Sequence, residues 1–124
     1  MPGHDAVIYF HIIGIMKTSD AIGAFLALGQ ETRLNIFRLT VQRGATGLTP
    51  SELVEKLGIP SATLSFHLKE LVRANLLFVE RQSRNLIYRP NAVLVQALSG
   101  FLLENCCGGE PCLPMSKKTK GATS

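Results

Sequence analysis

Between residues 49 and 75, apolar positions follow the 3.6-residue period of a helix in two short runs. Thr49 is expected to cap the first helix, with a proline directly after it, and Gly58 is expected to end it. The second helix begins at Pro60 and Ser61. Its inward stripe consists of Leu64, Leu68, Leu71 and Val72. The pattern therefore predicts two helices joined by a tight turn.

The opposite face of the second helix is polar. It carries small hydroxyl side chains and a lysine: Ser61, Thr63, Ser65 and Lys69. Side chains of this kind suit a helix inserted into the DNA major groove. An ordinary solvated face of a helical hairpin is the alternative. His67, one residue before a core leucine, is expected either to contact DNA or to form a structural hydrogen bond.

The flanking sequence predicts further elements around this pair. Two helices are expected before it, and a β-hairpin followed by a last helix is expected after it. Their ranges are Ser19–Gly29, Gln30–Arg43, a loop at Gly44–Leu48, strands Leu76–Glu80 and Leu86–Arg89 with a polar turn at Gln82–Asn85, and a helix at Ala92–Glu104. In the second of these helices we expect Leu34, Ile36, Phe37 and Val41 to point inward and Arg33, Arg38 and Arg43 outward.

The predicted fold is mostly α with one small β-hairpin, in the order α-α-α-α-β-β-α. A helix-turn-helix followed by a two-stranded wing is a winged helix-turn-helix. Its first and last helices carry more apolar surface than a small monomer should cover, so a homodimer is expected. The residues predicted at the dimer interface are Phe25, Leu28, Leu98 and Phe101.

Composition narrows the function. The chain has 124 residues and a net charge of +4, and residues 56–89 alone hold six basic residues against two acidic ones. This local charge favours nucleic acid, with Arg81 and Arg84 of the wing reaching the DNA backbone or minor groove. No apolar run is long enough to span a membrane, and no catalytic motif is recognised, so we expect neither a membrane partner nor an enzyme.

All three cysteines fall within seven residues: Cys106, Cys107 and Cys112. An odd, clustered set is a poor disulfide framework and suits a reducing cytoplasm. Two glycines and a proline between them allow the segment to fold back, so that three thiolates could meet on one soft ion. Trivalent arsenic and antimony take three sulfur ligands, whereas structural zinc takes four ligands. A redox pair or a tail without a role remains open.

Several motifs together resemble the ArsR/SmtB family of metal-sensing bacterial repressors. They are residues 27–34 (ALGQETRL), 64–71 (LSFHLKEL), 74–77 (ANLL) and the end of the wing at 84–88. The resemblance covers about residues 18–104. It implies a homodimer that sits on double-stranded operator DNA and leaves it when an inducer binds.

The arsenic-sensing members usually carry cysteines at the start of the first helix of the helix-turn-helix. Here Ser51, Glu52, Leu53 and Val54 occupy that region. The C-terminal cysteines instead resemble an arsenic-responsive subgroup with an adjacent pair and a third cysteine after the last helix. The resemblance thus implies arsenite, or antimony, as the inducer. Another soft ion, an organoarsenical, or a thiol redox or metal-carrier protein are the alternatives.

The chain is expected to divide into three parts. Residues 1–16 form an N-terminal extension, which is either an upstream addition or a short element covering a dimer. Residues 17–105 form the DNA-binding and dimerisation domain, and residues 106–124 form the cysteine-bearing segment with a basic tail.

Overall fold

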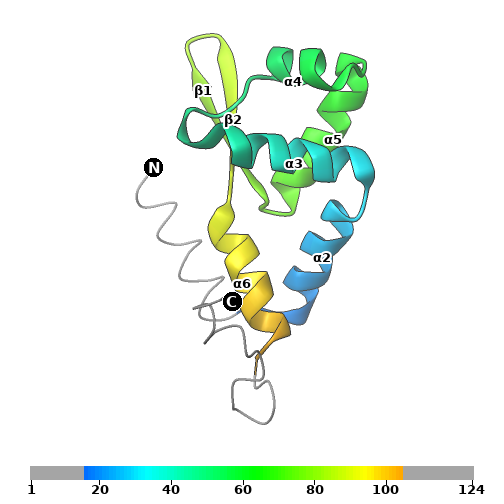
Figure 1. Cartoon of the computed structure of the whole chain (residues 1–124), viewed down its shortest axis with the longest axis vertical. Coiled ribbons are helices and arrows are strands. Elements are labelled where there is room, and N and C mark those ends of the chain that lie inside the picture. Colours follow the sequence, from blue (N-terminus) through cyan, green and yellow to red (C-terminus); the bar gives the residue numbers. More distant parts are fainter. Residues whose placement is uncertain (1–15, 105–124) are drawn as a thin grey trace, which may run out of the picture.

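The computed structural model describes residues 16–104, and the cysteines and the residues of both terminal segments other than Met16 lie outside this range. The element order is the predicted winged helix-turn-helix order (Figure 1). The elements are α2 (Thr18–Leu28), α3 (Glu31–Arg43), the 3₁₀ turn η1 (Gly44–Thr46), α4 (Pro50–Leu57), α5 (Ser61–Arg73), β1 (Leu77–Gln82), β2 (Asn85–Pro90) and α6 (Ala92–Leu102). The predicted fold class is confirmed.

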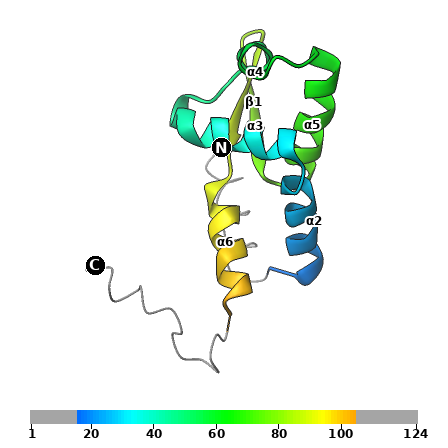
Figure 2. The same ribbon diagram turned by 45° about the vertical axis from the view of Figure 1, so that its right-hand side comes forward.

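The molecule has two ends. Helices α4 and α5 and the β-hairpin gather at one end, and α2 and α6 extend together from the other, as the two views agree (Figures 1 and 2). Helix α3 crosses between them and contacts α2, α5 and β2. This arrangement separates a module that presents α5 from a stalk made of the first and last described helices.

Local sequence sets the boundaries of the helix-turn-helix. Thr49 accepts a hydrogen bond from the Glu52 backbone N–H at 3.2 Å, and the Glu52 carboxylate accepts one from the Thr49 N–H at 2.9 Å. This reciprocal pair is a capping box, and it fixes the start of α4. Gly58 ends α4 in the left-handed region at φ 67°, which costs glycine little.

The end of α5 is closed by an asparagine. Asn75 has φ 65°, and the N–H of Leu76 donates to the Leu71 carbonyl at 2.9 Å. The Asn75 N–H donates to Val72 at 2.9 Å, which completes a Schellman motif. Asparagine tolerates this backbone region better than most residues, so α5 stops here and the chain turns directly into β1.

The hairpin is longer than the sequence indicated. Six residue pairs align from Leu77 opposite Pro90 to Gln82 opposite Asn85, so the turn contains only Ser83 and Arg84. Of these two, Ser83 alone has a positive φ, 59°, as in a type II′ turn. The short turn places Arg84 at the extreme tip of the wing.

The loop predicted at Gly44–Leu48 contains structure that the sequence did not reveal. After the turn η1, Leu48 and Tyr88 exchange two backbone hydrogen bonds, at 3.0 and 2.8 Å. Through this bridge, Leu48 pairs with β2 at the base of the wing in the manner of a very short third strand. It ties the wing to the segment between α3 and α4.

The core lies where all the helices and the hairpin base meet. Its fully buried large side chains include Ile36, Leu48, Leu53, Leu64, Leu71, Leu76 and Leu77. Two expectations for α3 are wrong, because Leu34 and Val41 are 43% and 49% exposed. Of the four residues predicted to point inward, only Ile36 and Phe37 are buried. The face of α3 that packs against the rest of the protomer is therefore narrower than the number of its apolar residues suggested.

One predicted interface residue also belongs to this core. Leu98 is 3% exposed within a single protomer and packs with the other buried apolar residues. Leu98 therefore contributes to the core of one protomer, and its predicted place at a dimer interface stays a prediction. Phe25 is 39% exposed, and Leu28 and Phe101 are half-buried, so these three retain apolar surface.

Candidate nucleic-acid interface

Helix α5 presents a polar face to solvent. Ser61, Thr63, Ser65 and Lys69 are all exposed, whereas Leu64, Leu68 and Leu71 face the core. Helix α4 packs against α5. The exposed face therefore has the composition and the accessibility that a helix entering a major groove requires.

The wing carries two cations that have no ion-pair partner among residues 16–104. Arg81 and Arg84 are exposed and form no ion pair within residues 16–104, and the same holds for Lys69 on α5. Arg89 differs, because it pairs with Glu80 at 2.5 Å and donates to the Ala45 carbonyl at 2.7 Å. Arg89 thus braces the base of the wing, while Arg81 and Arg84 keep their charge available for phosphate groups.

His67 occupies a structural position on α5. Its side chain is 9% exposed, and Arg33 of α3 donates from a guanidinium nitrogen to His67 Nδ1 at 3.2 Å. Arg33 Nε also donates to the Ala27 carbonyl at 2.7 Å, at the end of α2. The sequence left two roles open for His67, a contact with DNA or a structural hydrogen bond, and the structure shows the hydrogen bond. Because a guanidinium only donates, the neutral imidazole carries its proton on Nε2.

Arg33 was expected to point outward, and that expectation is wrong. It connects α2, α3 and α5 through the two bonds just described. The partners are six and thirty-four residues away in sequence, so no local spacing could reveal them. The sequence signal was an arginine in the first turn of α3, within the motif at residues 27–34 that resembles the ArsR/SmtB family.

Burial lowers the pKa of His67, the charge of Arg33 lowers it further, and Glu70 opposes both. Unfolding restores an ordinary pKa near 6.5, so below that pH the unfolded chain binds a proton that the folded chain does not. We expect the free energy of unfolding to fall as the pH drops from about 7 to about 5, with a slope of at most about 1.4 kcal/mol per pH unit from this group. The variant His67→Asn keeps an acceptor and should show a flatter profile in thermal melts. Equal slopes for both proteins would contradict this.

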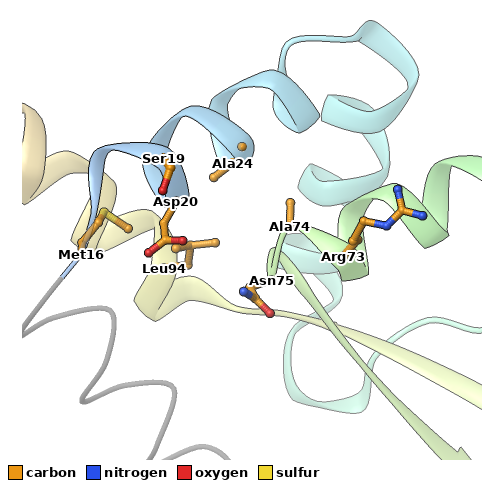
Figure 3. Close-up of a pocket in the computed structure, with 9 residues that line it drawn as sticks. Met16, Ser19, Asp20, Ala24, Arg73, Ala74, Asn75 and Leu94 are labelled. Atoms are coloured by element: carbon orange, nitrogen blue, oxygen red, sulfur yellow. The ribbon is translucent and has the colours of Figure 1, made fainter.

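A small cavity lies between the first turns of α2 and the end of α5 (Figure 3). Its volume is about 170 Å³, and Asp20, Asn75 and Leu94 are among its lining residues. Ligand pockets usually exceed about 300 Å³, so this space suits a few water molecules. Within residues 16–104 no cluster of His, Cys, Asp or Glu could hold a metal ion. No helix in that range is long and apolar enough to cross a membrane.

Comparison with known proteins agrees with this geometry. Residues 28–80 match a family of helix-turn-helix domains. No curated protein sequence matches the chain. An ArsR-like transcriptional regulator from Rhodococcus sp. RHA1 has a similar structure, with a TM-score of 0.64, 20% identity and coverage of 85% of this chain and 96% of that one.

Two further solved structures have the same fold. HlyU from Vibrio cholerae has a TM-score of 0.56 and 23% identity, covering 73% of this chain and 92% of that one. The antimony-specific transcriptional repressor AntR has a TM-score of 0.54 and 22% identity, covering 79% and 88%.

The chain is therefore a winged helix-turn-helix protein. Within that class it has the fold of the ArsR-family transcriptional regulators, as the sequence motifs indicated. The arsenic-responsive subgroup stays a prediction.

Proposed function

We propose that the protein is a cytoplasmic, homodimeric repressor that occupies operator DNA and leaves it when trivalent arsenic or antimony binds to Cys106, Cys107 and Cys112. The observation that carries the proposal is the exposed polar face of α5 together with a wing whose Arg81 and Arg84 form no ion pair with any described residue. In this assignment Ser61, Thr63, Ser65 and Lys69 approach bases and phosphates, and Arg81 and Arg84 bind the backbone.

Exposed apolar side chains on the stalk support the homodimer. Ile22, Phe25 and Leu26 of α2 are 52%, 39% and 70% exposed, and Leu102 and Leu103 at the end of α6 are 64% and 46% exposed. A second copy of the same stalk would cover this surface and set the separation of two reading helices.

The chemistry of the three thiols supports the choice of inducer. Thiolates are soft ligands, and three of them match the pyramidal coordination of trivalent arsenic and antimony better than the four-ligand coordination of structural zinc. The similar structure of AntR, described as an antimony-specific repressor, points to the same group of ions.

A physical route joins the cysteine-bearing end to the reading helix. Cys106 follows α6 in the sequence, and Asn91, which is 2% exposed, caps the start of α6. The Asn91 side chain donates to the Asn75 carbonyl at 2.8 Å, at the turn that closes α5. A shift of α6 would therefore be transmitted to the end of α5 through this partly buried hydrogen bond.

The test is a gel-shift titration on DNA from the promoter of the protein's own gene. The wild-type dimer is expected to bind in the absence of arsenite and to lose about 5–150-fold in affinity when arsenite is added. The triple variant Cys106→Ser, Cys107→Ser, Cys112→Ser should bind DNA equally well and stay bound when arsenite is added.

Different outcomes separate the alternatives. Release of the triple variant by arsenite would place the sensing site elsewhere. Release of the wild type by another soft ion or an organoarsenical, but not by arsenite or antimonite, would keep the repressor and change the inducer. Failure to bind any promoter fragment would favour a thiol redox or metal-carrier protein.

A further inference from the structure

Phe66 is an aromatic side chain on the solvent-facing side of α5. Its side chain is 56% exposed, and it is the one large apolar residue of α5 that is exposed to this degree. The inward stripe of α5 is already filled by Leu64, Leu68 and Leu71, so Phe66 adds nothing to the core. Helical spacing places it within one turn of Ala62 and Lys69, both exposed.

The ring of Phe66 is held in place from one side. It meets the His67 ring edge-on, with centroids 5.4 Å apart and planes at 66°. His67 is itself fixed by the hydrogen bond from Arg33. An edge-to-face aromatic contact of this kind restricts the rotation of the exposed ring, so the phenyl group is partly oriented before any partner binds.

The surroundings indicate which partner covers this ring. Lys69, within one turn of Phe66 on α5, and Arg81 and Arg84 of the wing are exposed and unpaired within the described part of the chain. An apolar protein partner would leave these charges without counterions, whereas the phosphates of DNA would neutralise them. The ring would then face the base edges in the major groove.

A phenyl group cannot form hydrogen bonds with the polar base edges. The one apolar group that the major groove offers is the 5-methyl of thymine, and apolar side chains recognise it by contact. We propose that Phe66 is a specificity-determining residue that packs against a thymine methyl in each operator half-site. This inference rests on the proposed DNA-binding function and names one chemical feature of the sequence it reads.

The test replaces each operator thymine in turn with deoxyuridine, which removes only the methyl group and keeps the base pair. For the wild-type protein, replacing one particular thymine of a half-site should cause a loss of about 4-fold in affinity, the value of burying one methyl-sized group. Phe66→Ala should lose a similar factor on the normal operator and no further factor at that thymine. Its affinity for random DNA should stay unchanged.

Leu34→Ala is the matched control, because Leu34 is an apolar residue of similar exposure, 43%, on α3. It should keep the wild-type sensitivity to deoxyuridine. Since Phe66 is exposed, Phe66→Ala should melt as the wild type does. If the wild type binds the operator and no thymine is sensitive, or if Phe66→Ala keeps the sensitivity, the inference is wrong while the repressor function stands. If the wild type binds no operator, the proposed function itself fails.

Discussion

Gly47→Ala is expected to lower the free energy of unfolding by about 3–4 kcal/mol. Gly47 has φ 74° and ψ −179°, a region that is essentially restricted to glycine. A Cβ at this position would lie 2.5 Å from Ile87 Cγ2 and 2.9 Å from the Tyr88 carbonyl oxygen. Because Tyr88 O also bonds to the Leu48 N–H, relieving the contact would open the bridge that holds the wing. Urea unfolding followed by circular dichroism measures the change.

Gly44→Ala separates the two causes of this loss. Gly44 lies at φ 85° and ψ −144°, and its Cβ would have nothing within 4 Å. This variant should suffer only the backbone cost, about 1–3 kcal/mol. If both variants lose the same amount, the contact with the wing contributes nothing and the close packing of Gly47 is unimportant.

Local chemistry explains why much of the fold followed from sequence. The capping box at Thr49 and Glu52, the left-handed Gly58 and the start of α5 all depend on residues within four positions of one another. The order of elements and the exposed set on α5 depend on periodicity, which is also local. The helix ends therefore fall within a residue or two of their expected positions.

Features made by distant residues did not follow from sequence. The bond between Arg33 and His67 spans thirty-four positions, and the bridge between Leu48 and Tyr88 spans forty. Each interaction joins a single pair of residues, so neither produces a repeating pattern that could be recognised in the sequence.

The sequence also predicted the wrong burial for some apolar side chains, because the apolar content of a helix does not define which of its faces is packed. Leu34 and Val41 of α3 were expected to point inward, and they are 43% and 49% exposed. A helix rich in apolar residues does not reveal how wide its contact with the rest of the protomer is. The predicted roles of Phe25, Leu28, Leu98 and Phe101 in a dimer, and of the three cysteines in sensing, stay predictions.

Asn91→Ala is expected to lower the free energy of unfolding by about 2–3 kcal/mol. The side chain of Asn91 accepts from the Leu94 N–H at 3.3 Å and so caps α6, and it donates to the Asn75 carbonyl at 2.8 Å. Losing the cap costs about 1 kcal/mol, and leaving the partly buried Asn75 carbonyl without its donor costs about 1–2 kcal/mol more. Thermal and urea unfolding measure the sum.

Asn91→Asp tests the donor alone. Aspartate caps a helix as well as asparagine does, but its carboxylate offers no N–H to Asn75 and places a negative charge beside that carbonyl oxygen. We therefore expect it to be at least as destabilised as the alanine variant, although its cap is intact. Asn85→Ala, at an exposed position next to the wing turn, should change the free energy of unfolding by less than about 0.5 kcal/mol. If Asn91→Asp were as stable as the wild type, Asn91 would serve only as a cap. The hydrogen bond from Asn91 to the Asn75 carbonyl would then have no part in joining α6 to α5.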